Sequence, residues 1–263
     1  MSRGLLLLLP PSETKRDGGN AASGAGEPAS GALRFPQLAA VRERTRRDLV
    51  ALCRDPAAAR AALKLSERLA GRELARNLEL ADDPPLMPAV LRYTGVLYDA
   101  LDAGSLDTAA RGWLAGHVAV QSALYGLTGA DEPIAAYRLS AGSRLPGESL
   151  RARWSAACGP LLAQHEGLVV DLRSKGYAAL APLPPGAVTV EVVASGPDGE
   201  RALGHFNKAA KGRFVRALAQ AAPASDPADA GELAELARSL GLTVRAEGTG
   251  RLVLTADEAS SPG

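Results

Sequence analysis

The stretch GLLLLLPPSETK, residues 4–15, decides the fold class of this chain. Five consecutive leucines, set between a glycine and a pair of prolines, predict a short buried strand over residues 4–9. The apolar run is far shorter than the roughly 20 residues of a membrane-spanning helix. It also lacks the longer apolar core and the small-residue cleavage site of a signal peptide. We therefore expect a strand in the protein core, a cytoplasmic location and no membrane partner.

Polar residues follow this strand directly, in the loop Pro10–Lys15. In α/β folds, ligands gather at the loops that leave the carboxyl ends of strands. Ser12, Thr14 and Lys15 could donate hydrogen bonds there to a phosphate or a carboxylate; the alternative is a polar turn without a ligand. Only five of the thirty cationic side chains are lysines. Because a lysine, unlike an arginine, has a pKa that its surroundings can shift, Lys15 is a candidate site residue.

Composition places the chain among ordinary globular proteins, with 263 residues, 46% hydrophobic and 22% charged. A net charge of +1 gives no global case for binding nucleic acid or a membrane surface, so any basic footprint must be local. The chain has no Walker-type loop, no GxGxxG and no GxSxG motif. Cys53 and Cys158 are isolated, and His117, His165 and His205 lack metal-ligand spacing. We expect no disulfide, no metal site and no cofactor.

The remaining patterns predict a single mixed sheet surrounded by helices. Residues 36–80 are helical in character, and within them Ser66 is suited to cap a helix that continues through Leu78. Residues 207–220 predict a further helix. Strand-like runs are Leu168–Leu172, Val188–Val193, Ala202–Phe206, Leu242–Ala246 and Leu252–Thr255. The short turn Glu247–Gly250 suits a hairpin between the last two runs.

Two segments predict loops. Residues 17–31 are rich in Gly, Ala, Ser and Pro, with too few apolar side chains to offset the entropy of ordering them. They predict a flexible loop inserted after Lys15. Residues 223–231 predict a polar surface loop. Neither segment marks a domain boundary, so we expect one α/β domain over residues 1–263.

A second polar loop repeats the arrangement of the first. The motif DLRSKGY, residues 171–177, follows the strand-like run that ends at Leu172. If this strand and the first one are parallel neighbours, their polar residues converge at one edge of the sheet. The converging residues would be Ser12, Lys15, Ser174 and Lys175.

Two further motifs each carry two interpretations. In HFNKAAKGR, residues 205–213, a helix would place Lys208 and Lys211 opposite an apolar stripe and near its positive end, forming an anion site or a merely solvated basic face. The segment from Ser122 to Arg138 could bring hydroxyls and a guanidinium over an anionic ligand, or could simply include a helix end at Gly126. Tyr93 and Tyr98 are most simply core tyrosines.

Taken in order, PPSETK, LSERLAG, YTGVLY, SALYGL, YRL, VVDLRSKGY and HFNKAAKGR resemble the YaaA family of bacterial peroxide-stress proteins. The resemblance covers residues 4 to 256. It implies a cytosolic protein that protects the cell during hydrogen peroxide stress, limits damage from unincorporated iron and binds DNA. It also implies a mixed α/β fold with a basic cleft and a helix-hairpin-helix over Ala57–Leu78. Such hairpins usually bind phosphate through a glycine-flanked turn, whereas this segment contains only Gly71.

The resemblance, carried over position by position, predicts a site that binds the DNA phosphate backbone without reading bases. The predicted site consists of these cations and the serines of the two polar loops: Ser12, Lys15, Arg138, Ser174, Lys175, Lys208, Lys211 and Arg213. One alternative is an enzyme with a Ser/Lys/Tyr pocket for a small phosphate- or carboxylate-bearing substrate. Lys15, Tyr137 and Lys175 are then the candidate catalytic residues, because a desolvated lysine beside another cation can act as a base or nucleophile. A third possibility is an interaction protein that affects iron handling through a partner.

Overall fold

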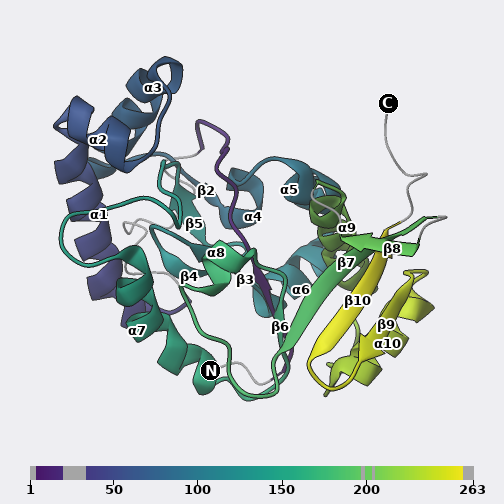
Figure 1. Ribbon diagram of the computed structural model, residues 1–263. Coiled ribbons are helices and arrows are strands. Elements are labelled where there is room, and N and C mark those ends of the chain that lie inside the picture. The colour runs from purple at the N-terminus through teal and green to yellow at the C-terminus, as the bar shows by residue number, and fades with distance from the viewer. Residues whose placement is uncertain (1–3, 20–33, 197–198, 203–204, 257–263) are drawn as a thin grey trace.

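The structure, a computed structural model, describes residues 4–19, 34–196, 199–202 and 205–256 and has a mixed α/β fold (Figure 1). The strands of its main sheet are β1 (Leu6–Leu9), β3 (Val118–Ser122), β4 (Gly126–Gly129), β6 (Val169–Asp171), β7 (Val188–Gly196), β8 (Gly199–Ala202), β9 (Val244–Glu247) and β10 (Arg251–Ala256). Their order is β4-β3-β1-β6-β7-β10-β9, and β8 pairs with β7. Strands β2 (Leu86–Pro88) and β5 (Pro133–Ala135) form a small second sheet. The predicted mixed α/β fold is confirmed.

Strand β1 lies inside the sheet, parallel to β3 on one side and to β6 on the other. Its four leucines are at most 2% exposed, so the leucine run is the core strand that the sequence predicts. Strand β6 is parallel to β7, and β7 is parallel to β10. The five parallel strands thus follow the order 2-1-3-4-5, which is common in doubly wound sheets. In that order, ligands bind beside the carboxyl ends of the first and third strands, here β1 and β6.

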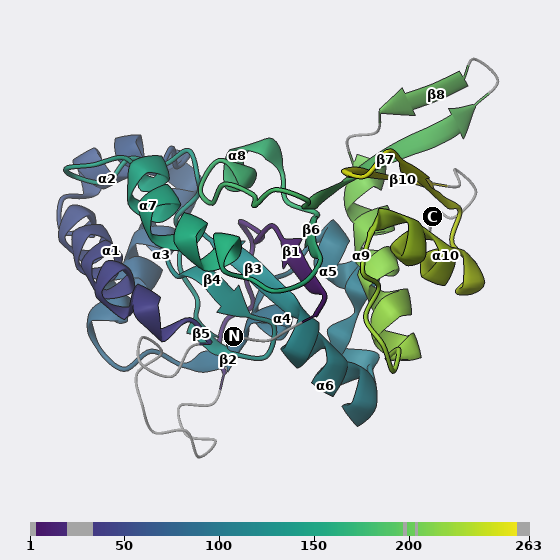
Figure 2. The ribbon, with the colours of Figure 1, turned by 90° about the horizontal axis from the view of Figure 1, so that it is seen from below.

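The helices lie around this sheet. They are η1 (Pro36–Leu38), α1 (Ala39–Cys53), α2 (Pro56–Ala62), α3 (Glu67–Leu78), η2 (Glu79–Ala81), α4 (Ala89–Arg92), α5 (Val96–Leu101), η3 (Ala103–Ser105), α6 (Thr108–His117), α7 (Leu150–Ala163), α8 (Lys175–Ala178), α9 (His205–Ala221) and α10 (Ala230–Ser239). Helices α1, α2, α3 and α7 lie at one end of the molecule, and α9 and α10 lie at the other (Figure 2). Within the described ranges, no helix has the length and apolar character needed to cross a membrane.

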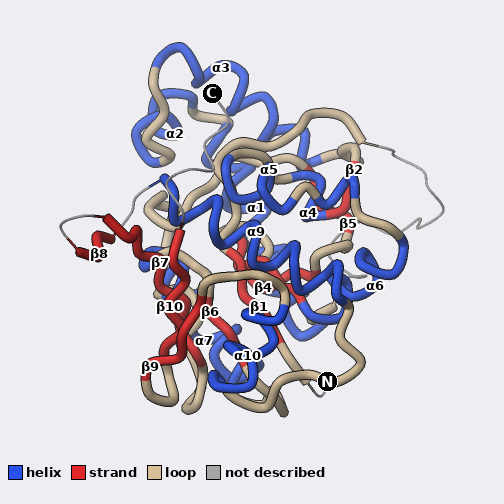
Figure 3. Tube along the Cα trace, turned by 90° about the vertical axis from the view of Figure 1, so that its right-hand side faces the viewer, coloured by secondary structure: helices blue, strands red, loops and turns tan. Residues whose placement is uncertain are grey.

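Several helices begin where the sequence provides a short polar cap. Asp55 accepts hydrogen bonds from two backbone N–H groups at the start of α2, and Ser149 does so once for α7. Ser66 precedes α3, as predicted, with extended backbone geometry, but its side chain makes no capping hydrogen bond. Helix α9 packs against α5 and α6 and also against β7 and β10 (Figure 3). Gly212 permits this approach, because a Cβ atom there would lie 2.2 Å from the Leu97 carbonyl oxygen.

The predicted strand over Ala202–Phe206 is wrong. Strand β8 ends at Ala202 and helix α9 begins at His205. A short apolar run alone does not distinguish a strand from the first turn of a helix. The predicted hairpin is confirmed, since β9 and β10 are antiparallel with Gly248 in the turn at a φ of 62°. Residues 20–31 of the predicted loop lie outside the described residues. Residues 222–229 connect α9 to α10, so the last two residues of the predicted loop 223–231 belong to α10.

Candidate functional site

Two polar loops leave the same edge of the sheet. Because β1 and β6 are parallel neighbours, the loop that carries Ser12 and Lys15 starts beside the loop that carries Ser174 and Lys175. The strand arrangement on which their predicted convergence depends is therefore confirmed. This edge is also where the 2-1-3-4-5 strand order favours ligand binding. We take it as the candidate site.

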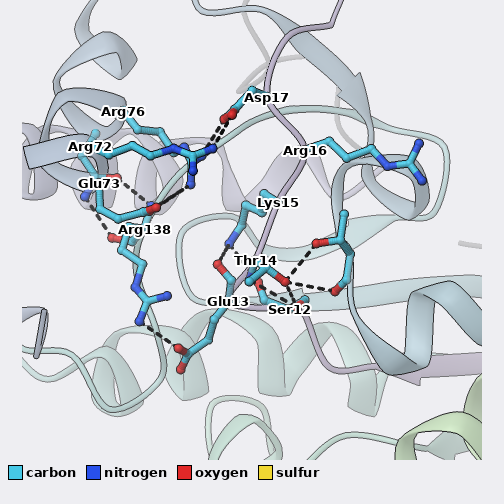
Figure 4. A network of polar contacts seen from close by, with 12 residues as sticks. Ser12, Glu13, Thr14, Lys15, Arg16, Asp17, Arg72, Glu73, Arg76 and Arg138 are labelled. Atoms are coloured by element: carbon cyan, nitrogen blue, oxygen red, sulfur yellow. Dashed lines mark hydrogen bonds and ion pairs between the residues drawn. The ribbon is translucent and has the colours of Figure 1, made fainter. Parts of the chain in front are cut away.

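Lys15 is the central residue of this edge. Its side chain is 7% exposed, although the residues on either side of it are exposed. The Nζ atom donates to the carbonyl oxygens of Ser12 at 2.9 Å and Glu13 at 3.4 Å (Figure 4). It also lies over the Tyr137 ring, 4.0 Å from the centroid, and 5.3 Å from the centroid of Tyr93. The ammonium group is thus held by carbonyl oxygens and aromatic faces.

The surroundings of Lys15 disfavour its charge. Burial lowers its pKa most, and the positive charges of Arg138 and Arg76 lower it further, to about 7. Glu73 and Glu13 oppose this effect, but each is engaged elsewhere. Glu13 accepts from Arg138 Nη2 at 2.8 Å, and Glu73 accepts from Arg76 Nη1 at 2.9 Å. A large fraction of the Lys15 amine is therefore uncharged near neutral pH.

A chain of hydroxyl groups runs beside Lys15. Ser122 Oγ lies 2.8 Å from the Tyr137 hydroxyl, which lies 2.9 Å from the Tyr93 hydroxyl. Ser122 Oγ already accepts from the backbone N–H groups of Leu124 and Tyr125 at 3.0 and 2.9 Å. Because these two bonds occupy both acceptor positions of the serine oxygen, its proton goes to Tyr137. Tyr137 in turn donates to Tyr93, so the chain has one direction and ends at Tyr93.

Burial raises the pKa of Tyr93, Tyr98 and Tyr137 well above the ordinary value, so all three remain protonated donors. Tyr98 donates to the Pro10 carbonyl oxygen at 2.8 Å, and its ring centroid lies 5.2 Å from that of Tyr93. The prediction that Tyr93 and Tyr98 are core tyrosines is confirmed. Tyr93 has the additional place at the end of the hydroxyl chain.

Side chains of helix α3 make hydrogen bonds to the residues of the site. Arg76 bonds to Glu73 within the helix and to Asp17 in the loop after β1 (Figure 4). Asn77 accepts from the Arg138 backbone N–H at 2.7 Å and donates to its carbonyl oxygen at 2.9 Å. The sequence analysis missed these α3 residues, although the Glu73-x-x-Arg76 spacing on a predicted helix is a recognisable ion-pair pattern.

A buried ion pair lies at the end of β6, on the other side of the candidate site. Arg173 donates from Nε to Asp171 at 2.7 Å, and both side chains are at most 4% exposed. Lys211 Nζ donates to the Leu172 carbonyl oxygen at 3.0 Å. The prediction that Lys211 lies with Lys208 on an exposed face of α9 is wrong, since Lys211 is 7% exposed. The reason is that α9 is covered on more than one face, by α5 and α6 as well as by the sheet.

The predicted site residues therefore differ in accessibility. Ser174, Lys175 and Lys208 are exposed. Ser12, Arg138 and Arg213 are half-buried, and Lys15 and Lys211 are buried. The structure brings Ser12, Lys15 and Arg138 into one network and places Ser174 and Lys175 at the same sheet edge. Lys208, Lys211 and Arg213 lie on α9. Which of these residues bind a ligand remains a prediction.

Two hollows in the described structure are not lined by Lys15. One, of about 290 Å³, is bordered by Arg42, Arg46 and Tyr125, and a smaller one of about 80 Å³ is bordered by Arg213 and Phe214. Within the described residues, no group of three or more His, Cys, Asp and Glu side chains is placed to hold a metal ion. Cys53 and Cys158 are buried free thiols.

The predicted helix-hairpin-helix segment folds into α2 and α3, joined by four residues. Lys64 in this turn has a φ of 55°, and Leu65 N–H donates to the Arg60 carbonyl oxygen at 3.0 Å. This 6→1 bond ends α2 with a residue in the left-handed region. Gly71 lies inside α3 and is exposed. The described turn therefore contains no glycine.

Comparison with known proteins places the chain. A family model described as peroxide stress protein YaaA matches residues 5–246. The UPF0246 protein SCO2297 of Streptomyces coelicolor is 45% identical over 251 residues, covering 92% of this chain and 93% of that protein. The UPF0246 protein CE1889 of Corynebacterium efficiens is 43% identical over 247 residues, covering 91% and 94%. The chain belongs to the peroxide stress protein YaaA family.

Proposed function

We propose that this protein acts in the cytosol during peroxide stress by binding the phosphate backbone of DNA, and that it thereby limits damage linked to unincorporated iron. Membership of the peroxide stress family supports the stress role. The observation that carries the DNA-binding part is a group of exposed cations on and next to the α2–α3 hairpin. These cations are Arg54, Arg60, Lys64, Arg68 and Arg72, of which Arg72 is ion-paired with Asp17.

The hairpin carries more positive than negative charge. Residues 54–72 contain these five cations and two acids, Asp55 and Glu67. Asp55 is occupied as the cap of α2, and Glu67 lies 3.9 Å from Arg60. Within the described part of the chain, no carboxylate lies within ion-pair distance of Arg54, Lys64 or Arg68. Such side chains can neutralise phosphates and release counterions.

The hairpin is joined to further exposed cations. The Arg144 backbone N–H donates to the Ala62 carbonyl oxygen at 3.0 Å, which brings the exposed Arg144 segment to the end of α2. Lys175, predicted from the sequence, is also exposed, whereas the exposed Lys208 lies on α9 at the other end of the molecule. We assign phosphate contact to the hairpin cations, Arg144 and Lys175, and not to the buried Lys15 and Lys211.

A salt titration of DNA binding tests this proposal. Affinity of the full chain for duplex, bulged and single-stranded DNA is measured over a range of salt concentrations. We expect log affinity to fall linearly with log salt, and the double variant Lys64→Ala/Arg68→Ala to reduce the slope by about two. Arg238→Ala, which removes an exposed cation from α10 at the other end of the molecule, is the matched control. Absence of salt-dependent binding, or equal effects of the hairpin and control variants, would contradict the proposal.

A further inference from the structure

Lys15 differs from the other lysines of the chain. Lys64, Lys175 and Lys208 are exposed, whereas Lys15 and Lys211 are buried. Burial lowers the pKa of both, but at Lys211 the charges of Asp171 and Glu191 are the opposing influences. At Lys15 the opposing carboxylates are those already bound to Arg138 and Arg76. Lys15 is thus a buried amine that has no carboxylate counter-ion of its own among the described residues.

The position of Lys15 adds to this difference. It follows β1 at the carboxyl edge of the sheet, beside the end of β6, where doubly wound sheets of this strand order hold their ligands. A buried lysine that makes only carbonyl and aromatic contacts at such a place is costly to stability. Such a cost is typical of a functional amine, and desolvation beside another cation is one of the ways in which a lysine nucleophile is activated.

Tyr93 supplies a matching proton donor. Lys15 and Tyr93 are paired by an isolated antiparallel bridge. The direction of the hydroxyl chain makes Tyr93 an acceptor from Tyr137, and the Ser122 hydroxyl also interacts with Tyr93. Donors arranged in a chain polarise one another. The Lys15 Nζ atom lies 5.3 Å from the centroid of the Tyr93 ring, so the amine and the phenol are neighbours in the fold.

We infer that Lys15 and Tyr93 form a covalent site for a small aldehyde or ketone that carries a carboxylate or phosphate. The Lys15 nitrogen adds to the carbonyl carbon, the carbonyl electron pair moves to oxygen, and that oxygen takes a proton from the Tyr93 hydroxyl. The nitrogen then gives one proton to the Tyr93 phenolate, which restores the hydroxyl. The second nitrogen proton leaves with the carbinolamine hydroxyl group as water, and a C=N bond to Lys15 remains. The step needs no oxidant or reductant. Arg138, which is ion-paired with Glu13, is the guanidinium that the acid group would share. This site is independent of the proposed DNA binding.

Reductive trapping tests the site with glyoxylate, an aldehyde that carries a carboxylate. The full chain is incubated with glyoxylate and cyanoborohydride at pH 7, and modified lysines are identified by peptide mass mapping. We expect Lys15 to be labelled at least about tenfold faster than Lys64, Lys175 or Lys208, because only the uncharged amine reacts. Lys211 is the internal control for a buried lysine and is expected to remain unlabelled. Labelling that follows exposure alone, with Lys15 unmodified, would overturn the inference without any variant being made.

Two variants separate the roles of the residues. Lys15→Arg removes the reactive amine and should abolish the labelling at this position while leaving DNA affinity unchanged. Tyr93→Phe keeps the ring and should slow labelling of Lys15 about tenfold, with the labelling of Lys175 unaffected. An unchanged Lys15 rate in Tyr93→Phe would refute the donor role of Tyr93. DNA binding that is lost without loss of Lys15 labelling would count against the proposed function only.

Discussion

The Nζ atom of Lys15 lies 4.0 Å from the centroid of the Tyr137 ring, although the two residues are 122 positions apart in the chain. The contact joins the loop after β1 to the segment after β5 and places a desolvated amine beside a directed chain of hydroxyls. It explains why a lysine in an otherwise exposed polar loop is buried.

The lowered pKa of Lys15 predicts how the stability of the variant Lys15→Met, relative to wild type, depends on pH. The pKa is about 7 in the folded protein against 10.5 for an unperturbed lysine, so between these values the unfolded chain binds more protons. Stability from this group is therefore lost as pH falls from 10.5 to 7. Lys15→Met should be favoured relative to wild type by a few kcal/mol at pH 6.5, and this advantage should shrink as pH rises towards 10. Urea unfolding at several pH values measures it; an advantage that is constant with pH would contradict the expectation.

The direction of the hydroxyl chain predicts the cost of breaking it. Tyr137→Phe leaves the buried Ser122 proton without an acceptor and should lower the free energy of unfolding by about 1–3 kcal/mol. Ser174→Ala, which removes an exposed hydroxyl, should change it by less than about 0.5 kcal/mol. Equal values from denaturant titrations of the two variants would argue against a closed buried network.

The buried Asp171–Arg173 ion pair predicts that replacing Arg173 greatly lowers the free energy of unfolding. Arg173→Met leaves a carboxylate that is 4% exposed without its partner, and should cost about 3–5 kcal/mol. Arg251→Met, which breaks pairs to Glu191 and Glu247 with a half-exposed arginine, should cost no more than about 1 kcal/mol. Chemical denaturation compares the free energies of unfolding of the two variants. Similar losses of stability would show that water reaches Asp171.

The turn between α2 and α3 predicts a stabilising substitution. Lys64 has a φ of 55°, a region that a glycine enters without strain. Lys64→Gly should therefore stabilise the protein by about 1 kcal/mol or leave it unchanged. Ala61→Gly, inside α2, should destabilise it by about 0.5–1 kcal/mol. A shift in the same direction for both variants, measured by thermal unfolding, would contradict the left-handed turn.

Local patterns in the sequence were sufficient for part of this structure. The leucine run, the position of Ser66 before α3 and the Glu247–Gly250 hairpin depend on neighbouring residues, and each was confirmed, although the Ser66 side chain makes no capping hydrogen bond. The convergence of the two polar loops could be stated only as a condition, because strand pairing between residues 6 and 171 is not local.

Which site residues are buried could not be predicted from neighbouring residues in the sequence. Lys15 is covered by Tyr93 and Tyr137, which come from distant segments. A helix with one apolar stripe predicts that Lys211 lies on the opposite, exposed face, whereas α9 is packed on several sides. The same lack of tertiary information turned the first residues of α9 into part of a predicted strand.

The ionisation of Lys15 can be observed directly. With only five lysines in the chain, nuclear magnetic resonance of protein labelled with ¹³C-lysine can follow each side chain through a pH titration, and Lys15→Arg assigns its signal. Our account predicts a midpoint near pH 7 for Lys15. A midpoint at the ordinary lysine value, about 10.4, would show that the amine is solvated and would contradict the account of the site.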